Sequence, residues 1–261
     1  MVDAQAMDQI VSAAQLAPDD TVMEIGTGLA TLTEKLAARA GRVITFEIDP
    51  RLRLIAASPL AHLPNVTLVP EDFLRANLAH YLKGLKRTLQ PYKIVSNLPY
   101  NITSPVLEKL YESKAPSPVL TVMTIQKEVA DRLTAAPDTS EYGGLTVILG
   151  ALTDIKIVAT IGPTSFKPQP GVTSTTIAIR QKEKPIVPPK EFPLFRSIVR
   201  SAFHQRRKML SNALRSVGEL TRRPGKLEKG AQKAGIDLTR RAETLSIQEF
   251  AALAHALYSP R

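Results

Sequence analysis

The feature that most constrains the fold is a regular alternation of short apolar runs with segments whose apolar residues recur at helical spacing. Each run has the length of a buried strand, and each is followed by a polar loop and then by a helical pattern. The runs are Thr21–Ile25, Arg42–Ile48, Val66–Val69, Tyr92–Val95 and Val119–Ile125. Because parallel strands are joined by long crossover connections, usually helices, the alternation predicts an α/β fold around a mostly parallel sheet.

Two further strand-like runs close this part of the chain, Ile155–Ile161 and Val172–Ile179. The segment that joins them, around Phe166–Val172, is too short to hold a crossover helix, so we expect these two strands to be antiparallel. A strand–helix alternation that ends in an antiparallel pair is the layout of the class I methyltransferase, or Rossmann-like, mixed sheet. We therefore predict one catalytic domain over residues 1–183.

Composition excludes several kinds of site. The chain has no cysteine, which excludes disulfides, thiolate metal ligands and Cys nucleophiles, and its four histidines are scattered, so we expect no metal centre. No apolar run approaches the length of a membrane span, and the N-terminal residues lack the features of a secretory signal or transit peptide. We therefore expect a cytoplasmic protein that does not associate with membranes.

The positive charge is concentrated at the C-terminal end. Residues 1–180 hold 17 Lys and Arg against 17 Asp and Glu, whereas residues 181–261 hold 17 against 7. The proline-rich stretch 184–190 is typical of an extended linker. Beyond it the pattern is helical, so we predict a small basic all-α domain over residues 191–261. A polyanion such as nucleic acid would offset the repulsion among its charges.

The first helix of this basic domain, about 192–203, has an apolar face and a neighbouring row of arginines that includes Arg200. If the helix ran on, Arg206 would fall inside the apolar stripe, so we expect a break near residues 204–205. Arg206, Arg207 and Lys208 would then lie at the start of a second helix, where charge and free backbone N–H groups both favour phosphates. We predict that Arg200 and these three residues bind the phosphates of a nucleic acid.

In the first domain, polar residues follow three successive strands. Gly26 and Gly28 lie in a turn between a strand and a helix, where glycine lets a ligand approach the backbone, and Ala30 occupies the place of a third glycine. Glu47 ends the next strand, where an acidic side chain holds a ribose diol, and Asp72 follows the third, where it suits an adenine amine. Together they predict one crevice for an adenosine-containing cofactor.

The loop after the fourth strand, Ser96–Asn101, combines a neutral amide, a proline-stiffened turn and an aromatic ring. The Asn97 side chain and the Pro99 carbonyl can accept hydrogen bonds from the amino group of a nucleobase, and the Tyr100 ring can stack on an extruded base. Phe166, on a second proline-stiffened loop, could face Tyr100 across that base. The alternative for Phe166 is a loop aromatic that plugs the edge of the sheet.

Taken together and in this order, eight segments resemble the KsgA-type family of small-subunit ribosomal RNA adenine dimethyltransferases, over about residues 2–255. The segments are Glu24–Gly28, Glu47–Asp49, Glu71–Phe73, Asn97–Asn101, Gln126–Ala130, Phe166–Ser174, Phe203–Lys208 and Arg241–Ser246.

The resemblance implies an S-adenosylmethionine-dependent enzyme that methylates two adjacent adenines near the 3′ end of small-subunit rRNA, leaving S-adenosylhomocysteine. It implies that the cofactor contacts Gly26, Glu47, Asp72 and Asn97, and that Asn97 and Pro99 receive the target N6 hydrogens. Tyr100 and Phe166 would stack the target base. The expected partner is small-subunit rRNA within a precursor particle, and we expect a monomer.

Members of this family carry a leader with a Gly-Gln-(Asn/His)-Phe-Leu type segment that closes over the cofactor. The present sequence starts about where that segment would end. On that basis we expect weak binding of S-adenosylmethionine by this polypeptide.

Three alternatives remain open from sequence. The macrolide-resistance methyltransferases modify a large-subunit rRNA adenine with the same catalytic loop. A ribosome-assembly factor could bind immature small subunits with little or no catalysis, since fold does not guarantee activity. DNA adenine methyltransferases are a weaker alternative, because they usually have an Asp-Pro-Pro-Tyr type loop.

Overall fold

The computed structural model describes residues 1, 3–82, 91–112, 117–218 and 225–258. The chain folds into two compact units. The first unit comprises residues 1–130 and 155–181, and the second comprises residues 131–154 and 182–261. Among the described residues, no helix is long and apolar enough to cross a membrane.

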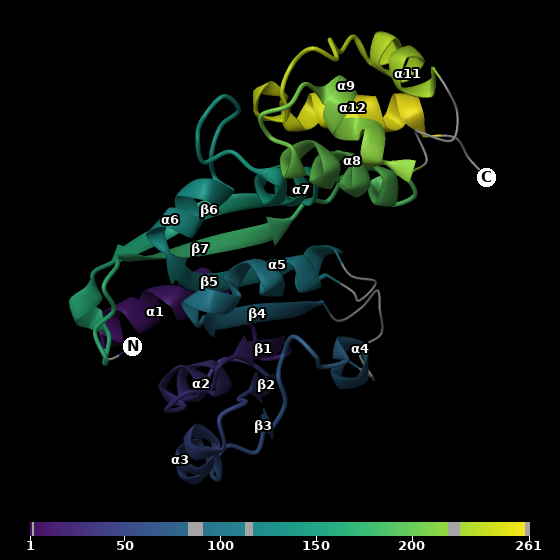
Figure 1. The fold of residues 1–261 in the computed structure, drawn as a ribbon. Helices are drawn as coiled ribbons and strands as arrows, with labels where there is room; N and C mark the ends of the chain where they lie inside the picture. The colour runs from purple at the N-terminus through teal and green to yellow at the C-terminus, as the bar shows by residue number, and fades with distance from the viewer. Residues whose placement is uncertain (2, 83–90, 113–116, 219–224, 259–261) are drawn as a thin grey trace. The chain divides into compact units, whose positions relative to one another are not determined.

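The first unit is built on a seven-stranded sheet in the order β3-β2-β1-β4-β5-β7-β6, which Figure 1 shows from bottom to top. The strands are β1 (Thr21–Ile25), β2 (Arg42–Phe46), β3 (Val66–Val69), β4 (Tyr92–Asn97), β5 (Leu120–Gln126), β6 (Thr153–Ile161) and β7 (Ser174–Gln181). The first five pair in parallel, and β7 runs antiparallel to β5. The predicted mixed sheet with an antiparallel final strand is confirmed.

Helices precede and connect these strands. They are α1 (Ala4–Ala13), α2 (Thr31–Ala37), α3 (Pro50–Leu60), α4 (Leu78–Tyr81), α5 (Thr103–Glu112) and α6 (Lys127–Leu133), with short 3₁₀ turns η1 (Tyr100–Ile102) and η2 (Pro163–Ser165). Their starts follow local chemistry: the side chain of Asp49 accepts from the Arg51 N–H at 2.8 Å to cap α3, and Pro50 takes the first helical position.

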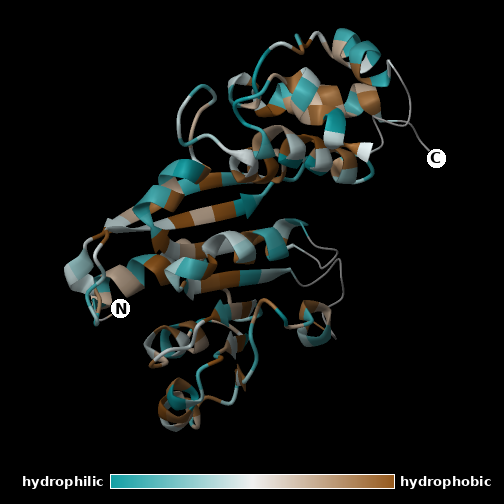
Figure 2. Ribbon diagram, in the orientation of Figure 1, coloured by the Kyte–Doolittle hydropathy of each residue, from teal (hydrophilic) through white to brown (hydrophobic). Residues whose placement is uncertain are grey.

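The middle of the sheet is buried. All five residues of β1 are buried, as are four of the six in β4 and six of the seven in β5. Burial along these strands is therefore nearly continuous rather than alternating, as expected for strands covered on both faces. Strand β7 is buried at its start and exposed at its end, where Arg180 and Gln181 are hydrophilic, as the colouring of Figure 2 shows.

The second unit is helical. Its elements are α7 (Gly144–Leu152), α8 (Phe192–His204), α9 (Leu210–Ala213), η3 (Leu214–Ser216), α11 (Lys226–Ala234), η4 (Ala242–Thr244) and α12 (Ile247–Leu257). Its core contains the fully buried rings of Tyr142, Phe195 and Phe250. The predicted break in the helical pattern is confirmed, because α8 ends at His204.

The division into units differs from the boundaries that we expected at residues 183 and 191. Residues 131–154, which we placed in the first domain, group with the C-terminal helices. The reason is packing: Tyr142, Val147 and Ile148 belong to the same apolar cluster as Phe195. The expected linker also packs there, since Val187 is 2% exposed and Ile186 N donates to Ala151 O at 2.9 Å.

Candidate functional site: a pocket at the sheet edge and a basic turn

The strand order reverses between β1 and β4, and the chain leaves both strands at the same edge of the sheet. Open α/β sheets bind ligands in the crevice at such a point. Ser96 Oγ donates to Ile25 O at 2.6 Å, which ties the two strand ends together. A Cβ built on Gly26 would lie 3.6 Å from Pro99 Cδ, so the glycine turn and the proline loop are in contact. The two loops predicted from sequence to be functional therefore meet.

The glycine turn has the conformation that its residues favour. Gly26 and Gly28 have φ of 84° and 55°, in the left-handed region where side chains are disfavoured. The N–H groups of Gly26 and Thr27 both donate to Phe46 O, at 2.9 and 3.2 Å, which holds the turn on β2. Ala30 is also left-handed, with φ of 65°, and is fully buried. An alanine therefore performs the backbone role of the third glycine.

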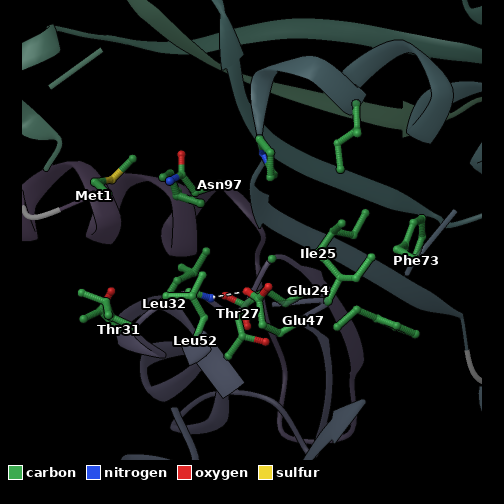
Figure 3. Close-up of a pocket in the computed structure, with 18 of the residues that line it drawn as sticks. Met1, Glu24, Ile25, Thr27, Thr31, Leu32, Glu47, Leu52, Phe73 and Asn97 are labelled. Carbon is green, nitrogen blue, oxygen red and sulfur yellow. Dashed lines mark hydrogen bonds between the residues drawn. The ribbon is translucent and has the colours of Figure 1, made fainter. Parts of the chain in front are cut away.

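A cavity of about 660 Å³ opens beside this turn. Its lining includes the glycine turn, the ends of β1 and β2, the turn after β3 and the proline loop. In the view of Figure 3, Glu24, Thr27 and Glu47 gather on one side of the pocket, while Asn97 and Phe73 lie elsewhere around it. Four carboxylates line the cavity, and among its described lining residues Lys167 is the only lysine or arginine. The pocket favours ligands with donor groups or positive charge.

Glu47 is 6% exposed and is held from two sides. Its Oε2 accepts from the Gly28 N–H at 2.9 Å, and its Oε1 accepts from the Asp49 N–H at 3.0 Å. A carboxylate oxygen has about two lone-pair sites, so each oxygen keeps one. The side chain is thus fixed in place and can still accept two hydroxyl hydrogens, as a ribose diol would offer.

Glu24 lines the same cavity and was not among the residues singled out from sequence. It is 1% exposed, and its Oε2 accepts from the hydroxyls of Thr33 and Thr45 at 2.6 and 2.7 Å. Burial raises the pKa of Glu24 to about 7, because desolvation of the carboxylate outweighs the two hydrogen bonds. A buried acid with a raised pKa in a cleft is a candidate functional residue.

Asp72 lies at the start of the turn after β3, on the cavity wall. Its Oδ1 accepts from the Leu74 N–H at 2.9 Å, and its Oδ2 is 3.8 Å from Arg75 Nε. The arginine is exposed, so this long pair contributes little. Asp72 therefore keeps acceptor capacity toward the pocket.

Asn97 is the last residue of β4, and its backbone pairs with Thr124 of β5. Its side chain reaches the cavity, and no described residue is its hydrogen-bond partner. The Pro99 carbonyl accepts from the Ile102 N–H at 3.2 Å, which leaves one lone pair. Both predicted acceptors can thus still accept a hydrogen bond, and both residues line the pocket.

The two predicted aromatic residues are placed differently. Tyr100 is half-buried, and its hydroxyl is 2.7 Å from Ser174 Oγ. Phe166 is 6% exposed and packs with Ile10 and Val11 of α1 in the apolar cluster of the first unit. Neither is among the lining residues. A stacking role for Phe166 would require its ring to leave this cluster, so that role stays a prediction.

The basic residues of the second unit lie in a turn and not, as expected, at a helix start. Residues 205–208 form the turn after α8, and α9 begins only at Leu210. The reason is the side chain of Arg206, whose Nε is 2.7 Å from Glu243 Oε2. Its terminal nitrogens donate to Ser140 O at 2.7 Å and Thr139 O at 2.9 Å. Three partners distant in sequence thus hold Arg206 inward.

Arg207 and Lys208, in contrast, are exposed, and so is Arg200 on α8. The structure therefore distinguishes Arg206, which is partly buried and held inward, from the other three predicted RNA-binding residues, whose side chains are exposed. Exposed cations of this kind suit phosphate contacts.

The cofactor implied by the sequence fits the pocket. S-adenosylmethionine offers a sulfonium, an amino group, a ribose diol and an adenine amine, all of which favour acceptors or negative charge. The cavity presents the carboxylates of Glu24, Glu47, Glu71 and Asp72. Gly26 and Gly28 leave room for close approach to the backbone. The residues present thus match the chemistry of this group.

Comparison with known proteins gives consistent results. A family model described as ribosomal RNA adenine dimethylase matches residues 1–257. Relatives named ribosomal RNA small subunit methyltransferase A from Bacillus cytotoxicus and Bacillus mycoides are 41% and 40% identical. Each alignment covers 98% of this chain and 88% of the relative.

Two solved structures share the fold. A dimethyladenosine transferase from Plasmodium falciparum aligns with a TM-score of 0.76 and 23% identity, covering 96% of this chain and 94% of its own. The 23S rRNA methyltransferase ErmE aligns with a TM-score of 0.70 and 28% identity, covering 98% of each chain.

Proposed function

The chain belongs to the ribosomal RNA adenine dimethylase family, and from that premise we propose the reaction and the role of each residue. The enzyme transfers methyl groups from S-adenosylmethionine to N6 of two adjacent adenines near the 3′ end of small-subunit rRNA. Its substrate is that rRNA within a precursor of the small subunit. It works as a monomer in the cytoplasm.

The observation that carries this proposal is the position of Asn97 and Pro99. Both line the acid-rich pocket, and both keep acceptor capacity. The lone pair of adenine N6 is delocalised into the ring, so the nitrogen is a poor nucleophile. Accepting hydrogen bonds from its N–H groups draws the nitrogen toward tetrahedral geometry and directs the lone pair. Catalysis by this chain is therefore a matter of positioning and electrostatics.

Glu47 would hold the ribose diol, and Asp72 the adenine amine. Gly26 would let the backbone approach the cofactor closely. When bound, S-adenosylmethionine supplies an electrophilic methyl group. Because Glu47 is buried and fixed by the N–H groups of Gly28 and Asp49, it can bind without reorganising. The target base would be held by stacking on Tyr100 and Phe166. Phe166 would reach the base only after its loop moves.

The exposed cations of the second unit are the proposed contacts for the rRNA backbone. These cations are Arg200, Arg207 and Lys208, and they can neutralise phosphates of the rRNA. Such contacts position the particle and do not depend on the base sequence. Arg206 supports this surface from within, through its contacts with Glu243, Ser140 and Thr139.

A second candidate is methylation of large-subunit rRNA. It is favoured by the similarity to the 23S rRNA methyltransferase over 98% of the chain. The higher identity, 41%, to relatives named for the small subunit favours our first proposal.

The test is methyl transfer from labelled S-adenosylmethionine to small subunits that lack the modification. Naked large-subunit rRNA and the Asn97→Ala protein are the controls. We expect dimethyladenosine in small-subunit rRNA, lost in the variant. Label on the large-subunit rRNA instead would establish the second candidate. Tight binding of small subunits with no transfer would replace our proposal with an assembly factor.

A further inference from the structure

Lys109, on α5, is a charged residue of the first unit that the proposed mechanism leaves unused. It is half-buried, and it does not line the cavity. Its ammonium donates to two backbone carbonyls of another segment, Leu74 O at 3.0 Å and Ala76 O at 2.7 Å. The lysine thus joins α5 to the turn after β3, 33 residues away for the closer contact.

The backbone N–H groups of that turn donate to acceptors within the turn, whereas the carbonyls of Leu74 and Ala76 accept from Lys109. The Leu74 N–H donates to Asp72 Oδ1, and the N–H groups of Arg75 and Ala76 donate to Asp72 O, each at 2.9 Å. Without the ammonium, two carbonyls would lose a charged partner. Hydrogen bonds to charged groups are stronger than neutral ones, so Lys109 is a main restraint on the turn.

The same ammonium also contacts the ring of Phe73, a residue that lines the pocket. It lies 5.8 Å from the ring centroid of Phe73, which is 3% exposed. The Phe73 ring packs edge-on against Phe46 with centroids 5.2 Å apart, and both rings line the cavity. Burial lowers the pKa of Lys109, and the charges of Asp72 and Glu71 oppose that shift.

We propose that Lys109 is a positioning residue for adenine recognition. It fixes the turn from Asp72 to Ala76, and with it the Asp72 carboxylate, where that carboxylate meets the amino group of the cofactor's adenine. The inference rests on the proposed function, which makes Asp72 the adenine ligand. Helix α5 is held by its own apolar residues, Val106, Leu107 and Leu110, so loss of the ammonium leaves the preceding catalytic loop in place.

The experiment compares Lys109→Met and Lys109→Arg with a matched control, Lys93→Met. Lys93 is also a lysine of the first unit with two internal contacts, to Gln15 O at 2.6 Å and Asp20 Oδ2 at 2.7 Å. It lies near the other end of β4 from Asn97. Calorimetry measures binding of S-adenosylhomocysteine and of its analogue in which hypoxanthine replaces adenine and the amino group is absent.

We expect the wild-type protein to prefer the adenine ligand. In Lys109→Met the dissociation constant for that ligand rises on the order of tenfold, while that for the hypoxanthine ligand changes little, so the preference shrinks. Lys109→Arg restores part of it. Lys93→Met keeps the full preference although it is less stable. A folded Lys109→Met protein with an undiminished preference would overturn the proposal.

Hydrogen exchange separates this inference from the proposed function. With no ligand present, the amides of Leu74, Arg75 and Ala76 should exchange faster in Lys109→Met and not in Lys93→Met; unchanged rates would refute the positioning role. If the wild-type protein binds the cofactor product with the expected preference but methylates no rRNA, the proposed function fails and the role of Lys109 stands. If it binds neither ligand, both fail.

Discussion

In the pocket of the first unit, the Glu47 carboxylate is buried and held by backbone N–H groups beside a cavity, whereas in the turn after α8 the cations Arg207 and Lys208 lie on the surface. Glu47 is 6% exposed with two fixed partners, but Arg207 and Lys208 are exposed. A buried, preorganised group recognises one small ligand through directed hydrogen bonds. An exposed cation recognises a polyanion through a charge that salt screens.

Each region also contains a charged residue whose side chain contacts partners within the protein. Lys109 supports the pocket from behind, and Arg206 holds the basic turn through Glu243, Ser140 and Thr139. In sequence both look like surface charges.

The largest effect is expected in the pocket. Asn97→Ala removes an acceptor at the reacting nitrogen, and loss of one such preorganised group lowers kcat by about 10²–10³-fold. The measurement is single-turnover methylation of small subunits at saturating cofactor. Binding of small subunits by the same protein is the control and should be unchanged. A variant with wild-type kcat would mean that Asn97 does not act on the nucleophile.

The next effect concerns the surface of the second unit. Replacing Arg207 and Lys208 together by glutamine should weaken binding of small subunits about 10–100-fold. The dependence of log K on log salt should flatten by about 1.4–1.8, as expected for two lost phosphate contacts. The affinity for S-adenosylhomocysteine should stay at the wild-type value. An unchanged salt slope would show that these cations do not contact phosphate.

Arg206→Met should act on stability and not on the salt slope. It removes three internal hydrogen bonds around a side chain that is about one-third exposed, and we expect a loss of about 2 kcal/mol in the free energy of unfolding. Urea denaturation measures it, with Arg207→Met as the matched control. If Arg206→Met instead flattens the salt slope of binding and keeps full stability, Arg206 is a phosphate contact.

Glu24 should make the free energy of unfolding depend on pH. Its pKa is about 7 in the folded protein against an ordinary value of 4.5, so the folded state binds the proton more tightly. Its contribution to stability is complete below about pH 4.5 and is lost as the pH rises to about 7. Glu24→Gln should remove this part of the dependence of the free energy of unfolding on pH.

The check is the free energy of unfolding from urea titrations at several values between about pH 5 and pH 8, in both proteins. The pKa values of Asp3, Asp237 and Glu249 are lowered in the folded protein, so their contributions change below this window. A parallel pH dependence in the two proteins would show that Glu24 is ionised throughout.

Sequence predicted the architecture and the polar residues that follow the strands because both depend on local pattern. The alternation of apolar runs indicated the sheet, and Gly26, Glu47, Asp72 and Asn97 follow successive strands, so they had to meet at one edge. What sequence could not predict depends on partners far along the chain. The pKa of Glu24 is set by burial and by threonines of two other segments, Thr33 and Thr45.

The same reason explains the other differences. The ion pair of Arg206 with Glu243 joins residues 37 apart, and the contacts of Lys109 reach 33 and 35 residues back. The grouping of residues 131–154 with the C-terminal helices depends on apolar packing of Tyr142 and Val147, which periodicity cannot assign to one core or another.

The interleaving of the two units has a consequence for synthesis. Translation delivers α7 long before α12, and in the finished protein α7 is covered together with α8 and α12 in one core. At roughly 5–20 residues per second, the nascent chain carries this apolar helix uncovered for several seconds. A gene cut at residues 184–190 would leave it uncovered permanently. The part before that cut is therefore a poor candidate for expression alone.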